Sequence, residues 1–437
     1  MKIGARIGMC LGLLMVFNVG KTNEQANIIE QLQALKAQQE ALNKKIATLE
    51  AAIAKIQKSD TSIEATVIGN QNDAVSNEHK RSSETEAPSN SESSIVAKLE
   101  ALDPSVFGDA RIRYEYNSPL PGESARERGV IRGRLGATIT PFNQLTIGAR
   151  LVGGDRDDPN TSDITLGSFD DDLDLGIDQL YGQYALGPTS LFFGKFPQIF
   201  SGTDMIWDGD IPLQGLGGQY RQAINTDWHI YLNATHFLID ENARGSDSSM
   251  NGLQIGAEYN SENLSLISHL SRYNYALTFL DSADEGDFRT NALKPDGSYL
   301  SNFDVIDVYM DVAYTSMEYF NQAGLRLHLV KNIDANIQGD SGWRVELYLG
   351  QIDNTQAWSL LYSVSALEQD AVLAAFSNDN IPIATNYKNH SLVFQWILAP
   401  SLLFDFTAYR FKVLDAMPGM PLINYENRLR LNLSYSF

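Results

Sequence analysis

Residues 128–140 read RGVIRGRLGATIT and alternate with a period of two. Ile131, Leu135 and Ile139 fall on one face together with small residues, whereas Arg132 and Arg134 fall on the other. The next segment, QLTIGARLVGG at 144–154, repeats the pattern. Because successive side chains of a β-strand point to opposite faces, each segment is predicted to be a strand with one apolar and one polar face.

The same alternation continues to the end of the sequence, where residues 426–437 read ENRLRLNLSYSF. We predict sixteen strands at 108–117, 127–140, 143–154, 177–187, 189–196, 214–222, 227–238, 249–260, 262–273, 305–317, 319–331, 341–351, 354–366, 386–398, 400–413 and 424–437. Many of them have ten or more residues, which suits a tilted membrane crossing.

The predicted connections alternate between tight turns, such as Gly187-Pro188-Thr189, and long loops, such as 155–176 and 274–304. Short turns on one side and long loops on the other are typical of outer-membrane barrels, whose long loops face outside. A β-sandwich also alternates, but it places turns every 8–12 residues at both ends. We therefore predict an all-β fold, a 16-stranded antiparallel transmembrane β-barrel over residues 106–437, preceded by an α-helical coiled coil.

Charge and hydropathy exclude other classes of protein. The 437 residues contain 33 Lys and Arg against 54 Asp and Glu, a net charge of −21. Such acidity argues against nucleic acid as a partner. After the N-terminus no apolar run reaches the roughly 18 residues that a transmembrane helix needs.

The first twenty residues, MKIGARIGMCLGLLMVFNVG, place Lys2 and Arg6 before an apolar stretch from Ile7 to Val19. This layout predicts a signal peptide over residues 1–20, with a short helical anchor as the alternative. Cys10 is the only cysteine of the chain and lies within this segment. The processed chain would therefore have neither a disulfide nor a zinc–thiolate site.

Residues 24–58 carry an uninterrupted heptad pattern, which predicts a coiled coil and hence a homo-oligomer. Gln39 lies in the seam among mixed Ile and Leu residues, so the pattern does not separate dimer from trimer. A lone amphipathic helix is the alternative. Residues 59–100 are polar and predict a disordered spacer. The apolar seam consists of Ile28, Leu32, Leu35, Leu42, Ile46, Leu49, Ile53 and Ile56.

If the apolar faces of the strands contact lipid, their alternate residues line the interior. Strands at the two ends of the barrel region, which closure would make neighbours, then contribute eight arginines. Arginines facing lipid would cost about 2–4 kcal/mol each near the midplane, so we expect them inside. The alternative is that they only form structural ion pairs with Asp109 and Glu115. This predicted arginine wall comprises Arg111, Arg113, Arg128, Arg132, Arg134, Arg150, Arg428 and Arg430.

The segment 194–215, GKFPQIFSGTDMIWDGDIPLQG, contains three acids in a short span, Asp204, Asp208 and Asp210. By themselves these acids are compatible with a metal site, a catalytic cluster or a solvated loop. Counting strands places residues 197–213 in the third long loop of the predicted barrel.

Several motifs resemble known outer-membrane proteins. The final strand, ending in Tyr435 and Phe437, resembles the C-terminal strand of Gram-negative outer-membrane proteins. The segments GDARIRYE at 108–115 and WDGD at 207–210 resemble the putative porin family, whose members have a signal peptide, an N-terminal coiled coil and a barrel. This resemblance implies a barrel in the outer membrane of a Gram-negative bacterium, with the coiled coil in the periplasm. In sixteen-stranded porins the third loop folds into the channel, which implies a constriction of Asp204, Asp208 and Asp210 facing the arginine wall.

Enzymatic motifs are not evident. His269, His328 and His390 are scattered in the sequence without a nucleophile motif, and we predict no enzyme activity. The acidic loop 155–176 lacks EF-hand spacing, so we interpret it as solvated, with hard-cation binding as the alternative. We expect neither a cofactor nor a metal.

These features lead to one functional hypothesis and one alternative. We expect a trimeric porin that allows passive diffusion of small hydrophilic solutes and ions, with outer-membrane lipid around it; the trimer follows from the resemblance alone. The ion preference stays open, because the arginine wall favours anions whereas the net negative charge of the whole chain favours cations. The alternative is a structural anchor whose stalk reaches the cell wall, which makes peptidoglycan a candidate partner.

Overall fold

The computed structural model describes residues 102–119, 124–154, 162–167, 175–278, 280, 283, 288–317, 321–352, 357–416 and 425–437. The predicted signal peptide (1–20), coiled coil (24–58, with the whole seam) and spacer (59–100) lie outside these residues. The chain divides into two units, residues 1–87 and 88–437, and every described residue belongs to the second.

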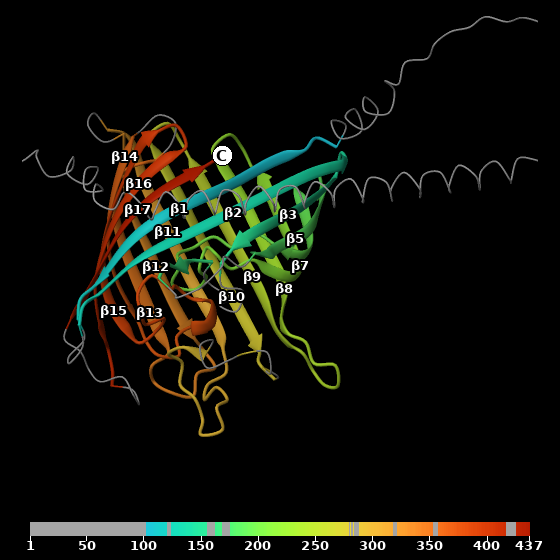
Figure 1. Ribbon diagram of the computed structural model, residues 1–437. Coiled ribbons are helices and arrows are strands. Elements are labelled where there is room, and N and C mark those ends of the chain that lie inside the picture. Colours follow the sequence, from blue (N-terminus) through green and yellow to red (C-terminus); the bar gives the residue numbers. More distant parts are fainter. Residues whose placement is uncertain are drawn as a thin grey trace, which may run out of the picture. The chain divides into compact units, whose positions relative to one another are not determined.

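The second unit is an all-β barrel of sixteen long antiparallel strands and one very short one (Figure 1). Each of the sixteen predicted strands overlaps one long strand, so the predicted strand number is confirmed. The strands are β1 Ser105–Asn117, β2 Arg126–Phe142, β3 Leu145–Gly153, β4 Ile164–Thr165, β5 Leu175–Leu186, β6 Thr189–Phe196, β7 Leu213–Ala223, β8 Trp228–Asp240, β9 Ser248–Asn260, β10 Leu264–Ala276, β11 Asp304–Met317, β12 Asn321–Asn332, β13 Ser341–Gly350, β14 Trp358–Leu367, β15 Tyr387–Ala399, β16 Leu402–Val413 and β17 Glu426–Ser436.

Strand β1 closes the sheet, because it pairs with β2 on one side and with β17 on the other. Ile112 is opposite Ile131 in one ladder and opposite Leu433 in the other. Beyond this register, Gly108 and Phe437 exchange backbone hydrogen bonds of 3.0 and 3.1 Å. Closure leaves no open edge between first and last strand, as a spanning sheet requires in lipid.

The two faces of the barrel differ as the alternation predicts. Outward residues are apolar and exposed, for example Ile112 at 64% and Leu270 at 56%. Inward residues on the same strands are buried, including Arg113 and Glu115 on β1 and His269 on β10. An apolar exterior around a polar interior is the pattern of a membrane barrel.

The short strand β4 was not predicted. It pairs with β2 at Val130 and Ile131, beyond the point where β3 ends at Gly153. It therefore covers the part of β2 that extends past β3. A two-residue strand has no periodicity to recognise, and the preceding residues 155–161 lie outside the described part of the chain.

Two long connections fold into the barrel. The first inner loop, residues 197–212, joins β6 to β7; the second inner loop, residues 368–386, joins β14 to β15 and contains the 3-10 helix η2, Ala374–Phe376. Both contribute to one buried apolar cluster with inward residues of the wall. The expectation that long loops face outside is therefore wrong for the second inner loop, because its apolar side chains are buried against other apolar residues. No helix in the described part of the chain is long and apolar enough to span a membrane.

A charge on the outer surface should destabilise the barrel in lipid. Leu270 lies in the middle of β10 and faces outward, so we expect Leu270→Arg to lower the free energy of unfolding by about 2–4 kcal/mol. Denaturant titration of protein folded into vesicles measures this, with Leu270→Met as the matched control. Equal stability of both variants would contradict the outward, lipid-facing position.

Candidate functional site in the barrel interior

The arginine wall lies on four strands that are consecutive around the barrel, β17, β1, β2 and β3. The pairing of β1 with β17 places Arg111 and Arg113 next to the strand that bears Arg428 and Arg430. All eight side chains are buried or half-buried and contact acidic or amide groups.

Glu115 is the acid at the centre of one half of this wall. Its Oε1 accepts a hydrogen bond of 2.8 Å from Arg128 Nε, and its Oε2 accepts one of 2.7 Å from Arg430 Nε. Arg428 Nε lies 3.6 Å from the same carboxylate. Glu115 is 0% exposed, so three guanidinium groups share one buried anion.

The other half of the wall is built around two aspartates. Asp109 on β1 accepts hydrogen bonds of 3.0 Å from Arg132 Nη2 and 2.6 Å from Arg134 Nε. Asp210 from the first inner loop binds the same two arginines, at 3.1 Å from Arg132 Nη1 and 2.7 Å from Arg134 Nη1. The first inner loop therefore reaches the arginine wall through Asp210.

Two further acids in this region were missed from the sequence. Asp163, next to β4, forms ion pairs with Arg111 and Arg113, and Asp178 on β5 lies 3.1 Å from Arg150 Nε. Burial raises the pKa of Asp163, but the two arginines outweigh burial and hold the pKa below its usual range. Five carboxylates thus contact the eight arginines of the wall. The excess of positive over negative side chains is therefore smaller than the residues of β1, β2, β3 and β17 alone indicate.

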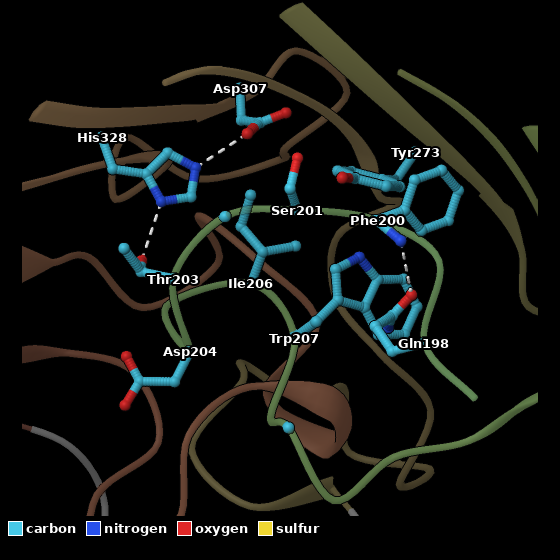
Figure 2. A pocket seen from close by; sticks show the side chains of 12 residues that line it. Gln198, Phe200, Ser201, Thr203, Asp204, Ile206, Trp207, Tyr273, Asp307 and His328 are labelled. Carbon is cyan, nitrogen blue, oxygen red and sulfur yellow. Dashed lines mark hydrogen bonds and ion pairs between the residues drawn. The ribbon is translucent and has the colours of Figure 1, made fainter. Parts of the chain in front are cut away.

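The predicted constriction acids occupy three different environments. Asp210 contacts the arginine wall, whereas Asp204 forms an ion pair with Arg344 on β13 and accepts 2.6 Å from Asn380 Nδ2. The first inner loop also contacts β12, where Thr203 Oγ1 lies 2.8 Å from His328 Nδ1 (Figure 2). The loop therefore spans the interior from β2 to β12 and β13.

Asp208 is buried between the two inner loops. Its Oδ1 accepts a hydrogen bond of 2.9 Å from the backbone N–H of Asp210. Its own backbone N–H donates a hydrogen bond of 2.8 Å to the Phe376 carbonyl. Burial raises the pKa of Asp208 well above its usual range, and Asp379, Asp210 and Asp204 raise it further by repulsion.

Trp207 anchors the first inner loop. Its ring stacks on Phe376 of the second inner loop, with centroids 5.6 Å apart and planes at 16°. It also meets Phe237 on β8 and Tyr273 on β10 edge-on. Stacked and edge-on aromatic pairs contribute about 0.5–1.5 kcal/mol each beyond area burial, so Trp207 holds both inner loops against the wall.

The second inner loop reaches the arginine wall through Asn380. Arg430 donates a hydrogen bond of 2.9 Å to Asn380 Oδ1, and Arg428 donates one of 3.0 Å to the backbone carbonyl of Asn380. The sequence contains a signal for this loop that we did not use: AVLAAF at 371–376 and IPIA at 381–384 are apolar stretches within a long connection. An external loop would expose such stretches to water.

Two histidines that are far apart in the sequence also meet in this interior. His269 on β10 and His328 on β12 flank Asp307 on β11, which corrects the impression of scattered histidines. His390 lies on β15 and hydrogen-bonds Tyr362 instead. Ser201 Oγ is 3.3 Å from His269 Nδ1, a Ser–His–Asp contact that is not apparent from the sequence.

The closed barrel agrees with comparisons to known proteins. Residues 73–280 match the family described as "Putative porin". The matched part is slightly less than half of the chain. No curated protein matches.

Solved structures are also similar to this chain at low sequence identity. The chain is similar to OprB of Pseudomonas putida, with 12% identity, a TM-score of 0.51, and coverage of 79% of this chain and 96% of that one. It is also similar to Salmonella typhi OmpF in complex with daunomycin, with 9% identity, a TM-score of 0.48, and coverage of 76% and 97%. At such identities the likeness to OprB shows a shared fold.

Removal of the central carboxylate should destabilise the arginine wall. In Glu115→Gln, Arg128, Arg428 and Arg430 lose their shared anion, and unpairing a buried charge costs about 3–5 kcal/mol. We expect a clear fall in the unfolding temperature of the folded barrel, measured by heat-dependent migration in gels. Glu241→Gln, at an exposed position, is the control and should melt like the parent protein.

The burial of Asp208 predicts a pH dependence. Because its pKa is higher in the folded chain than the ordinary 3.8, the folded chain holds the proton to higher pH than the unfolded chain. The free energy of unfolding should therefore fall as pH rises from about 4 through the raised pKa. The unfolding temperature of the parent protein should fall with rising pH across this range, and that of Asp208→Asn should change less. Equal pH dependence of the two proteins would contradict a role for Asp208.

Proposed function

We propose that this protein is an outer-membrane porin that allows passive diffusion of small hydrophilic solutes and ions. The observation that carries the proposal is a closed sixteen-stranded barrel with an apolar exterior and an interior lined by charged side chains. Charged side chains inside a membrane barrel are expensive unless paired or wet, and they are typical of barrels that conduct. The partial match to the "Putative porin" family supports the same class.

The constriction in this proposal is formed where the first inner loop crosses the interior. Arg132 and Arg134 with Asp210 form one side, and Asp204 with Arg344 forms the other. Opposite charges across a narrow wet passage create a transverse field that sorts solutes by charge and dipole. The second inner loop fills a further part of the interior, so passage is restricted to small solutes.

The proposed setting is the outer membrane of a Gram-negative bacterium, with lipid around the barrel. The heptad seam proposed for residues 24–58 would join the chains into an oligomer, a trimer by analogy with porins, and its periplasmic position would bring it towards peptidoglycan. Without an enzymatic step, no cofactor is needed.

A second candidate function is a structural anchor that does not conduct. The observation in its favour is the buried apolar cluster inside the barrel, which includes Trp207 and Phe376. Such packing resembles the core of a soluble protein more than a wet channel wall. In this case the barrel would hold the stalk in the membrane.

Conductance of purified protein in planar bilayers distinguishes the two candidates. A steady conductance in discrete steps supports the porin. A barrel that inserts into vesicles of the same lipid, shown by protection from protease, and yet remains electrically silent in planar bilayers supports the anchor.

Selectivity variants test the constriction separately. Asp210→Asn removes a negative charge beside Arg132 and Arg134, so we expect a shift towards anions. The double variant Arg132→Gln with Arg134→Gln should shift selectivity towards cations. Zero-current potentials in a salt gradient measure both, with Asp247→Asn in an exposed loop as the control. If all variants match the parent protein, the constriction is elsewhere.

A further inference from the structure

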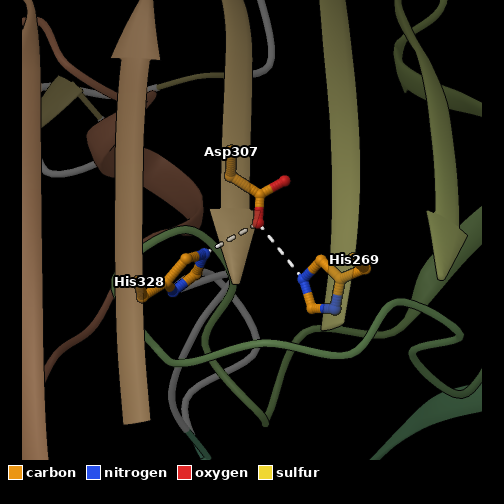
Figure 3. A group of neighbouring side chains, drawn as sticks. All are labelled: His269, Asp307 and His328. Atoms are coloured by element: carbon orange, nitrogen blue, oxygen red, sulfur yellow. Dashed lines mark hydrogen bonds and ion pairs between the residues drawn. The ribbon is translucent and has the colours of Figure 1, made fainter. Parts of the chain in front are cut away.

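The barrel interior contains a cluster of His269, Asp307 and His328. These residues project inward from three adjacent strands, β10, β11 and β12 (Figure 3). They are 2%, 1% and 1% exposed. Two imidazoles and a carboxylate thus lie together in the buried interior. None of them takes part in the ion pairs described above.

The ligand atoms converge. Asp307 Oδ2 lies 2.7 Å from His328 Nε2 and 3.3 Å from His269 Nε2, and the three ligand atoms all lie within 4.8 Å of one another. A tetrahedral ion with bonds of about 2.0–2.2 Å holds its ligand atoms roughly 3.3–3.6 Å apart. The cluster needs only small side-chain adjustments to reach that spacing.

Hydrogen bonds around His269 permit a proton on its Nδ1 nitrogen. Ser201 Oγ donates 3.0 Å to Gln254 Oε1, and the same Gln254 donates through Nε2 to the Ser201 carbonyl, which fixes the amide orientation. With its proton directed at Gln254, Ser201 Oγ is an acceptor towards His269 Nδ1 at 3.3 Å, and Tyr231 OH lies 3.2 Å from the same nitrogen. In the tautomer with the proton on His269 Nδ1, that nitrogen donates to Ser201 Oγ, and Ser201 is not set up as a nucleophile.

This tautomer leaves a lone pair on His269 Nε2 facing the carboxylate of Asp307. His269 Nε2 lies 3.3 Å from Asp307 Oδ2, and His269 Nε2 and Asp307 Oδ1 are buried without a hydrogen bond to any described residue. Two facing acceptors repel each other unless a cation lies between them. A proton on Nε2 or a metal ion would each satisfy the pair, and the second imidazole favours the metal.

His328 differs from His269 in its contact with the carboxylate. Its Nε2 forms a hydrogen bond of 2.7 Å with Asp307 Oδ2, where a bound ion would replace the proton, and its Nδ1 lies 2.8 Å from Thr203 Oγ1 of the first inner loop. Metal-ligating histidines commonly donate the other ring N–H to an oxygen, which orients the ring. Ser201 and Thr203 would each orient one imidazole.

A cavity of about 280 Å³ adjoins the cluster and is lined by Asp307, His328, Thr203 and Asp204 (Figure 2). Its space exceeds the roughly 30 Å³ share of one water molecule. Gly202 lies over the cluster at a φ of +148°, where a Cβ would come 3.4 Å from His328 Cε1. The cavity and the missing side chain at Gly202 together leave room for a further ligand of a bound ion.

The surrounding charge favours a cation. Arg326 pairs with Asp311 and Glu346, and Arg344 pairs with Glu346 and Asp204. With Asp307 included, these carboxylates outnumber the two guanidinium groups. Unlike the arginine wall, this side of the interior has a net negative charge.

We propose that His269, Asp307 and His328 bind one divalent transition-metal ion of the zinc class, with an open coordination position towards the cavity. Two imidazoles and a carboxylate are the donors that such ions prefer over Mg²⁺ and Ca²⁺. The ion joins three strands of the wall and, through Ser201 and Thr203, fastens the first inner loop. The site does not depend on whether the barrel conducts.

Metal titration of the full chain, untagged, in detergent and freed of metal with a chelator, tests the proposal. We expect Co²⁺ to give visible absorption bands that saturate at one ion per chain, and Zn²⁺ to displace Co²⁺. His269→Gln and His328→Gln should abolish saturable binding, whereas His236→Gln, at an exposed position outside the cluster, should bind like the parent protein. Folding of each variant is checked by heat-dependent migration.

The orienting hydroxyl gives a second readout. Thr203→Val keeps the side-chain volume but removes the acceptor for His328 Nδ1, so Zn²⁺ affinity should fall about 10–100-fold without loss of stoichiometry. Absence of a saturable site in the parent protein overturns the proposal even if a variant fails to fold. Equal binding by the parent protein and both histidine variants overturns it as well and identifies adventitious surface binding.

Discussion

Closure of the sheet is the constraint on which the rest of the structure depends. In lipid, an unpaired backbone N–H or carbonyl costs several kcal/mol, so β1 must pair with both β2 and β17. Once the sheet is closed, every strand has an outside and an inside, and the alternation of its sequence decides which side chains contact lipid. Closure also brings the two ends of the barrel region together, which assembles the arginine wall from residues such as Arg113 and Arg430.

The interior combines two kinds of packing that are usually separate. On one side, eight arginines are held by five carboxylates; on the other, aromatic side chains of two inner loops form an apolar cluster. Asn380 of the second inner loop links the first inner loop to the arginine wall, since it contacts Asp204 and the two arginines of β17. The inner loops are thus attached at several points, which explains how connections of this length keep defined positions inside a wide barrel.

Strand number, alternation and the adjacency of the arginines were predictable, because each follows from a local period of two combined with closure. RGVIRGRLGATIT predicts its own two faces without knowledge of any neighbour. The pairing of Asp163 with Arg111, the inward path of residues 368–386 and the meeting of His269 with His328 were not predictable in this way. Each depends on how a loop or a strand two positions away is placed, and no local pattern records that.

The sequence by itself determined that this chain forms a closed barrel with charged residues inside, because alternation and strand length are local properties that a bilayer permits in few ways. Only the tertiary structure decided what each charge faces. Asp204, Asp208 and Asp210 look equivalent within 194–215, yet one contacts Arg344, one is buried against the second inner loop and one binds Arg132 and Arg134. The physical reason is that a loop crossing a barrel presents successive side chains to different walls, and that path is determined by packing around Trp207 and Phe376.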